Sequence, residues 1–145
     1  MDDCIFCKII RKEISSKTIY EDSDSLAFLD INPASPGHVL VVSKKHHANI
    51  FSIDDNDLEK LAVCTKKVAN IIKEKLGVEN INILQNNGKH AGQLVSHMHF
   101  HVIPRYPNDG IMISFPRAQT AEKDLDDMKK KLTESTAKKD WDLEW

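Results

Sequence analysis

The chain has 145 residues, of which 41% are hydrophobic and 29% are charged, and its formal net charge is −2. This length suits one domain with a real hydrophobic core, and the near-neutral charge excludes a strong electrostatic attraction to nucleic acid. No apolar run is long enough to span a bilayer, and the acidic start Met1-Asp2-Asp3 argues against a secretory signal. Three cysteines cannot all pair within one chain. We therefore expect a cytoplasmic protein with neither nucleic acid nor a membrane as partner.

The first part of the chain predicts a short helix, a hairpin and a strand. Residues 4–13 are typical of a short helix. Ile19-Tyr20 and Leu26–Leu29 are apolar runs on either side of the turn-like Asp22-Ser23-Asp24, which predicts a hairpin. After a loop rich in proline, His38–Ser43 has the β-branched composition of a strand.

The clearest predicted element is a helix over residues 54–76. Its apolar positions recur at three- and four-residue steps and so share one face: Leu58, Leu61, Ala62, Thr65, Val68, Ala69, Ile72 and Leu76. Ser52 or Asp54 can cap its start, and Gly77 follows its end. Cys64 lies on the same face, so we predict that it is a small core residue.

The second part of the chain predicts two strands and a final helix. Ile81–Leu84 is a strand, the polar loop Gln85–Gln93 follows it, and a second strand spans roughly residues 95–103 and is closed by Pro104. Residues 121–138 suit an amphipathic helix. Strands joined by short connections, with helices beside them, predict an α+β fold with a mainly antiparallel sheet.

Three histidines in five residues are the strongest functional signal. His97, His99 and His101 alternate along a strand, so their side chains point to one face, about 6.5–7 Å apart, while Met98 and Phe100 face a core. Packing alone explains such a face poorly, and the pattern indicates a functional site. Two chemistries fit it: a three-histidine metal site, or imidazole as a nucleophile toward phosphorus or carbon. The triplet alone does not separate them.

The loop before the triplet favours an anionic ligand. Residues 86–93 hold two glycines that let the backbone approach a ligand closely, and Asn86, Gln93, Lys89 and exposed amides supply donors. Taken alone, this stretch is an ordinary polar loop. Beside three histidines it predicts a phosphate cradle, with His90 solvated.

Four ordered segments resemble the histidine-triad (HIT) family, nearest to bacterial-type members of its Hint-like branch. Residues 91–105 carry the family's His-x-His-x-His followed by two apolar residues, and the other segments are 4–10, 27–33 and 37–46. The resemblance implies a HIT-like α+β fold, in which a mainly antiparallel β-sheet carries a long helix and short flanking helices. It also implies one domain over residues 1–145, with its core at about 4–106 and a C-terminal helical extension at about 107–145.

The same resemblance implies an enzyme that is a nucleotidyl hydrolase or transferase. It would act at the α-phosphorus of purine nucleotide conjugates, either phosphoramidates or dinucleoside polyphosphates. His99 matches the nucleophile that forms a covalent nucleotidyl-histidine, His101 the histidine that contacts the phosphate, and His38 the upstream histidine that completes the cluster. Asp30, in the nucleotide-pocket segment, would bind ribose hydroxyls. The other matches to nucleotide-binding positions are Ile31, Asn86, Gly92 and Gln93.

The pair Cys4-x-x-Cys7 has zinc-knuckle spacing, although a redox pair or two buried cysteines would show the same spacing. Some HIT proteins hold a structural zinc with such a pair and two histidines, and the matching histidines here are His46 and His97. Two thiolates and two imidazoles suit tetrahedral zinc, so we expect structural zinc and no organic cofactor. His47 could replace His46 in this role.

One position departs from the family pattern. Leu94 stands where many members carry serine or threonine, whose hydroxyl helps to hold phosphate oxygens or the leaving group. This departure favours the alternative of a nucleotide-binding interaction or sensor protein with little catalysis. A third possibility, a metal-dependent hydrolase with all three histidines as ligands, lacks a clear carboxylate base nearby in sequence, and the resemblance speaks against it. The resemblance also implies a homodimer, and Trp141 and Trp145 would pack on the domain or on the second subunit.

Overall fold

The computed structural model describes residues 3–134, and the chain divides into a first compact unit that ends at Ile111 and a second that begins at Met112. The elements of the first unit are α1 (Ile5–Ile10), β1 (Thr18–Glu21), β2 (Ser25–Leu29), β3 (Val39–Ser43), α2 (Asp55–Leu76), β4 (Asn80–Leu84), a short 3-10 helix (Lys89–Ala91) and β5 (His99–Arg105). The second unit contains α3 (Glu122–Thr133).

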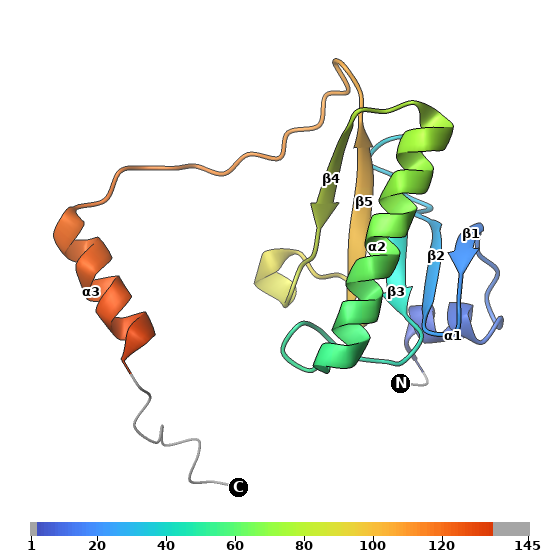
Figure 1. The fold of residues 1–145 in the computed structure, drawn as a ribbon, viewed down its shortest axis with the longest axis horizontal. Coiled ribbons are helices and arrows are strands. Elements are labelled where there is room, and N and C mark those ends of the chain that lie inside the picture. Colours follow the sequence, from blue (N-terminus) through green and yellow to red (C-terminus); the bar gives the residue numbers. More distant parts are fainter. Residues whose placement is uncertain (1–2, 135–145) are drawn as a thin grey trace, which may run out of the picture. The chain divides into compact units, whose positions relative to one another are not determined.

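The strands form one five-stranded sheet in the order β1-β2-β3-β5-β4, and every neighbouring pair is antiparallel. The long helix α2 lies across one face of this sheet, and α1 lies on the other (Figure 1). The prediction of an α+β fold with a mainly antiparallel sheet, a long helix and short flanking helices is confirmed.

Alternation along the strands separates two hydrophobic clusters, one on each face of the sheet. Val39 and Val41 pack with α2, whereas Leu40 and Val42 pack with α1. In the register of β3 and β5, Leu40 is paired with His101 and Val42 with His99. Both histidines therefore belong to the α1 face. The residues that alternate with them belong to the α2 face, as predicted: Met98, Phe100 and Val102.

Local sequence explains the ends of α2. The Asp54 side chain caps the first turn by accepting from the Asp57 amide at 2.8 Å, and Gly77 ends the helix in the left-handed conformation at φ 66°. Cys64 is 2% exposed within the core under α2, as predicted. Two positions assigned to the apolar face, Ala62 and Leu76, are exposed instead.

The last strand differs from its prediction at both ends. β5 begins at His99 and not near residue 95, because the His97 amide turns back to the Val95 carbonyl at 2.8 Å. Pro104 lies inside β5 and does not close it. The sheet tolerates this proline because β3 pairs with β5 only as far as Val102, which leaves one side of β5 unpaired there.

The helix of the second unit is exposed along its whole length, including its apolar side chains Leu125, Met128 and Leu132. It ends at Thr133, so the predicted helix over residues 121–138 is confirmed only in part. Glu134 is extended, and residues 135–138, together with Trp141 and Trp145, lie outside the described residues. Within residues 3–134, no helix has the length and apolar character needed to cross a membrane.

Candidate functional site

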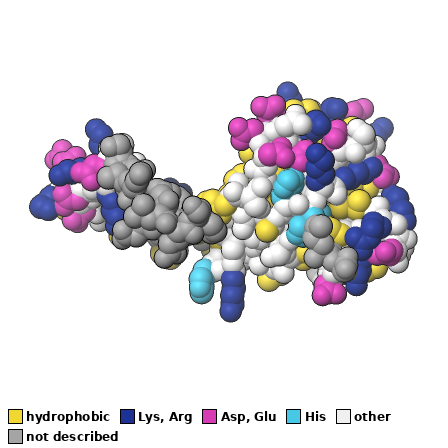
Figure 2. Space-filling view, turned by 90° about the horizontal axis from the view of Figure 1, so that it is seen from below, with side chains coloured by type: hydrophobic (Ala, Val, Ile, Leu, Met, Phe, Trp, Pro, Cys, Tyr) yellow, Lys and Arg dark blue, Asp and Glu magenta, His cyan; other side chains and the backbone are white. Residues whose placement is uncertain are grey.

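A cavity of about 410 Å³ opens on the α1 face of the sheet, beside His99 and His101. Its walls are mostly apolar side chains, with a few polar groups, which is the usual composition of small-molecule sites. The apolar walls come from α1, the strands and the loop before β5: Ile5, Phe6, Ile9, Phe28, Leu40, Leu94 and Val95. Figure 2 shows histidine side chains reaching one face of the molecule, with positive and negative side chains interspersed around them.

His99 is held as one defined tautomer. Its Nδ1 lies 2.6 Å from the His97 carbonyl oxygen, and a carbonyl can only accept. Nδ1 therefore carries the proton in the neutral ring, and Nε2 keeps its lone pair. The residue is 7% exposed, and burial lowers the pKa of its imidazole despite the carbonyl contact and the charge of Asp30. The site thus holds a neutral imidazole with one nitrogen free for nucleophilic attack.

Two successive hydrogen bonds fix the opposite tautomer in His101. The Ala34 amide donates to Nδ1 of His38 at 2.9 Å, so a neutral His38 carries its proton on Nε2. That nitrogen lies 2.9 Å from Nδ1 of His101 and donates to it. The proton of His101 is then on Nε2, as a hydrogen-bond donor. Burial lowers the pKa of His101 to about 4, and the pKa of His38 is also lowered by burial.

Among the described residues that line the cavity, Asp30 is the one with a carboxylate. Its Oδ1 accepts from the Asn32 amide at 2.8 Å, and its Oδ2 lies 3.6 Å from Nε2 of His38. Ile31, beside it, is 86% exposed at the rim. The nucleotide-binding positions implied by the resemblance come together around this cavity, with one exception. Those that line it are Asp30, Ile31, Asn86, Gly92, His99 and His101.

The exception is Gln93, whose side chain ties down the loop. Its Oε1 accepts from the Gly88 amide at 2.8 Å, and its Nε2 donates to the Ala48 and Val95 carbonyl oxygens at 2.6 and 3.1 Å. Gln93 therefore shapes the loop around the cavity without lining it.

In the predicted phosphate cradle, backbone amides already donate hydrogen bonds within the loop itself. The amides of Ala91, Gly92 and Gln93 donate to carbonyl oxygens of the same loop, each at 3.1 Å. Within the described part of the chain, the amides of the next three residues, 94–96, have no such partner. The donors available to an anion therefore lie just after the loop that the sequence indicated.

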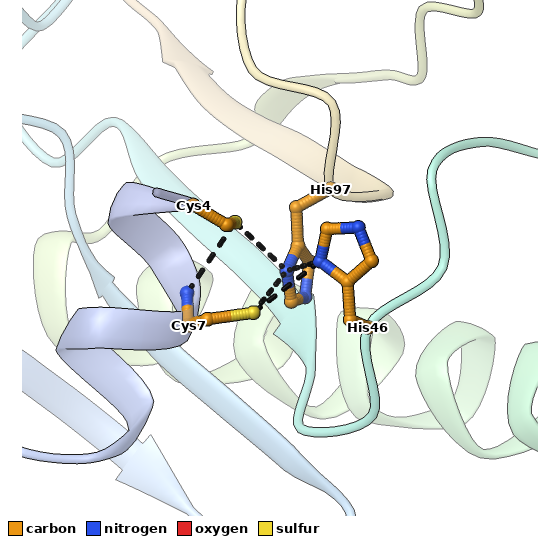
Figure 3. Close-up of side chains that lie close together, drawn as sticks. All are labelled: Cys4, Cys7, His46 and His97. Carbon is orange, nitrogen blue, oxygen red and sulfur yellow. Dashed lines mark hydrogen bonds between the residues drawn. The ribbon is translucent and has the colours of Figure 1, made fainter. Parts of the chain in front are cut away.

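Four other side chains converge on one point from three parts of the chain (Figure 3). Cys4 and Cys7 come from the start of α1, His46 follows β3, and His97 precedes β5. The Cys7 sulfur lies 3.3 Å from Nδ1 of His46 and 3.5 Å from Nδ1 of His97, and the two nitrogens are 3.2 Å apart. The Cys4 sulfur is also 3.5 Å from Nδ1 of His97.

These distances fit a tetrahedral zinc site. Zinc bonds of about 2.1 Å to nitrogen and 2.3 Å to sulfur place tetrahedral ligand atoms roughly 3.4–3.8 Å apart, within a few tenths of an ångström of the separations here. Nε2 of His97 lies 2.7 Å from the Ser43 carbonyl oxygen, so it carries the proton and leaves Nδ1 for a metal. His47 does not compete with His46, because its Nε2 contacts Asp57 at 2.8 Å.

Phe6 is a contact of the site that the sequence reasoning missed. Its ring packs edge-on against His99, with centroids 5.1 Å apart, and also contacts the ring of His97 at 5.9 Å. Ser15 and Ser16, after α1, line the cavity as well. Strand alternation could have placed Phe28 and Leu40 on the same face of the sheet as His99, but no local signal shows where α1 packs.

Comparison with known proteins agrees with this geometry. A model of the HIT domain matches residues 11–108. A HIT-like protein of Methanocaldococcus jannaschii is 47% identical, over 89% of this chain and 98% of its own length. A relative from Schizosaccharomyces pombe, named adenosine 5'-monophosphoramidase, is 44% identical over 78% of this chain and 83% of its own.

A solved structure adds a likeness in three dimensions. The structure of a zinc-bound histidine triad family protein from Mycobacterium smegmatis superposes with a TM-score of 0.72 at 34% identity. The match covers 84% of this chain and 87% of that one. Fold, site and sequence agree, and the chain belongs to the HIT family.

Proposed function

We propose that this protein is a nucleotidyl hydrolase or transferase that acts at the α-phosphorus of purine nucleotide conjugates through a covalent adduct on His99. One observation carries the proposal. The His97 carbonyl holds Nδ1–H of a buried, neutral His99, which leaves the Nε2 lone pair available at a nucleotide-sized cavity.

The reaction proceeds in two displacements. Nε2 of His99 attacks the α-phosphorus, a P–N bond forms, and the bond to the leaving group breaks with its electron pair on that group. Water then attacks the phosphorus and the P–N pair returns to Nε2, while a proton of the water passes to the solvent, from which the departed group takes one. Nε2–H of His101 and the amides after Gln93 donate to the phosphoryl oxygens as charge develops. His38 acts through His101, because its hydrogen bond fixes the tautomer that makes His101 a donor.

The rest of the cavity suits a nucleoside. Its apolar walls accept a purine, and the carboxylate of Asp30 can accept from two neighbouring ribose hydroxyls. Ile31 and Asn86 complete the pocket, with Gly92 at its phosphate end. The name of the Schizosaccharomyces pombe relative supports adenosine phosphoramidates as the first substrates to test, ahead of dinucleoside polyphosphates.

The four ligands Cys4, Cys7, His46 and His97 would hold a structural zinc. A metal bound there supplies a cross-link between α1, the segment after β3 and the segment before β5. His99 is not among these ligands, so we propose that the phosphoryl chemistry does not use this metal. Thiolate ligands of this kind are kept reduced in the cytoplasm, where we place the protein.

The second candidate is a nucleotide sensor with little catalysis. Leu94 favours it, because this side chain is 95% exposed at the cavity and offers no hydroxyl to the phosphate or leaving group. We also propose a homodimer, as the family likeness implies. Among the described residues, β4 is the last strand on its side of the sheet, and we propose its outer edge as the contact. Light scattering in solution measures this directly.

Turnover of adenosine 5'-phosphoramidate, followed as AMP release, tests the proposal. Rapid acid-free quenching of a labelled substrate should place the label on His99. Tight AMP binding with no turnover of phosphoramidates or dinucleoside polyphosphates would favour the sensor. An adduct on any other residue would contradict the proposed mechanism.

A further inference from the structure

The short helix α1 lies between the metal-type site and the nucleotide cavity and contacts both. It has six residues, and a helix this short has no stability of its own in water. Its position therefore depends on what holds it to the rest of the fold. Cys4 caps its start, with the sulfur accepting from the Cys7 amide at 3.5 Å, and both sulfurs face His97.

The other side of the same helix forms part of the cavity wall. Phe6 stands between the two cysteines in sequence, is 6% exposed, and meets the ring of His99 edge-on at an interplanar angle of 89°. Ile5 and Ile9 line the cavity beside it. Any movement of the first turn of α1 thus changes both the cysteine positions and the packing against His99.

His97 is a second physical link between the two sites. Its ring nitrogen Nδ1 faces the thiols, and its carbonyl oxygen accepts from Nδ1 of His99 at 2.6 Å. A shift of the His97 ring moves the backbone of the same residue, so it also moves the carbonyl oxygen that holds His99. Two contacts therefore connect the cluster of four ligands to the cavity, one through α1 and one through this backbone.

We infer that α1 couples the two sites: with Phe6 as the positioning residue, metal bound by Cys4, Cys7, His46 and His97 strengthens nucleotide binding in the His99 cavity. This inference rests on the proposed function, because it takes the cavity to be a nucleotide site. Metal binding fixes the first turn of α1, and the fixed Phe6 ring holds both the apolar wall and the imidazole of His99. Linkage requires the reverse effect of equal size, so nucleotide must tighten zinc binding by the same factor.

That reciprocity gives a test that does not depend on turnover. Zinc affinity of the full chain is measured by competition with a chromogenic chelator, without AMP and with saturating AMP, and AMP affinity is measured by calorimetry. In the wild type we expect AMP to tighten zinc binding roughly fivefold to tenfold. In Phe6→Ala, and in the milder Phe6→Leu should the first variant fail to fold, the gap should shrink to less than about twofold.

Ile31→Ala is the matched control, because Ile31 lines the cavity from the loop after β2 and not from α1. It should weaken AMP binding and keep the full effect of saturating AMP on zinc affinity. Zinc affinity that is unchanged by bound AMP in the wild type would overturn the coupling but leave the proposed function standing. Full coupling in both Phe6 variants would overturn the role of Phe6. A wild-type protein that binds no AMP would overturn the proposed function itself.

Discussion

Two histidines only two residues apart, His97 and His99, face the same side of the sheet and serve different sites. Both are buried, at 0% and 7% exposure. Their difference lies in which ring nitrogen a backbone carbonyl engages. The Ser43 carbonyl engages Nε2 of His97 and leaves Nδ1 facing two thiols, whereas the His97 carbonyl engages Nδ1 of His99 and leaves Nε2 at the cavity. One carbonyl contact thus selects a metal ligand in one case and a nucleophile in the other.

Protonation does not distinguish the two residues. Burial lowers the pKa of His97 to about 4 and lowers the pKa of His99 as well, so both rings are neutral near pH 7. Metal binding and nucleophilic attack both need the neutral ring. The tautomer decides which ring nitrogen is free and which site it faces, and this decides the chemistry of each histidine. Substitutions at the two sites should therefore have different consequences.

The largest expected effect is that of His99→Ala on turnover. The substitution removes the imidazole whose Nε2 lone pair is free at the cavity, so kcat should fall by roughly three orders of magnitude or more. AMP affinity should fall far less than kcat, because the other cavity groups remain, and thermal stability should fall only by the cost of a cavity at this buried side chain. Steady-state kinetics, calorimetry and thermal melting measure the three quantities. Near-normal turnover by this variant would contradict the assignment of the nucleophile.

Cys7→Ser should have the complementary result. Loss of one thiolate should abolish stoichiometric zinc and lower the free energy of unfolding by roughly 3–4 kcal/mol, the contribution of a ligand present at 100–1,000 times its dissociation constant. The folded variant should retain most of its kcat at saturating substrate. Metal analysis, urea unfolding and kinetics provide the measurements.

Cys64→Ala is the control for that variant, because Cys64 is a buried cysteine in the core on the α2 face and is not among the four ligands. It should lose some stability to a small cavity and keep one zinc per chain. Should Cys7→Ser stay folded, lose all turnover and regain it with added zinc, the metal would belong to the chemistry and the two sites would not be distinct.

Asp30→Asn should have an intermediate effect, confined to the cavity. Loss of the charged acceptor should weaken AMP binding by about 1–3 kcal/mol, the usual cost of a lost charged hydrogen bond. Zinc content should not change. A comparison of AMP with its 2′,3′-dideoxy analogue identifies the group concerned, since the wild type should prefer the ribose and the variant should not. Equal binding of both by the wild type would give Asp30 another role.

The sequence predicted the parts of this comparison that depend on regular alternation or on local signals. The two-residue period placed His99 and His101 together and Met98 on the opposite face, and the periodic apolar positions of α2 placed Cys64 in the core. The resemblance to HIT proteins brought Cys4, Cys7 and His46 together with His97, which no spacing in one sequence can do. The structure places all four ligand atoms within 4.8 Å of one another.

Features that depend on tertiary contacts were not predictable. The tautomers depend on carbonyl groups such as that of Ser43, which reaches His97 from 54 positions away. The packing of Phe6 on His99 depends on where α1 settles. The start of β5 depends on the turn made by the His97 amide, and the internal bonds of the loop ending at Gln93 depend on its own glycine conformations.

The smallest expected effect concerns the cost of keeping the cavity histidines neutral, and His101→Asn measures it. The folded-state pKa of His101 is lowered to about 4, mainly by burial and then by the neighbouring histidines. In the unfolded chain this side chain titrates near its ordinary value of about 6.5. As the pH falls below about 6.5, the unfolded state therefore binds a proton that the folded state does not bind, and stability is lost until about pH 4.

His101→Asn removes this proton uptake, so the free energy of unfolding of the variant should depend less steeply on pH in that window. The variant should also be less stable near pH 7, because the bond to His38 is weakened. The zinc-site histidines titrate in both proteins and cancel in the difference between the two curves. Urea unfolding at a series of pH values provides the measurement. Parallel curves of unfolding free energy against pH would mean that keeping His101 neutral in the folded protein costs no stability, which would contradict this prediction.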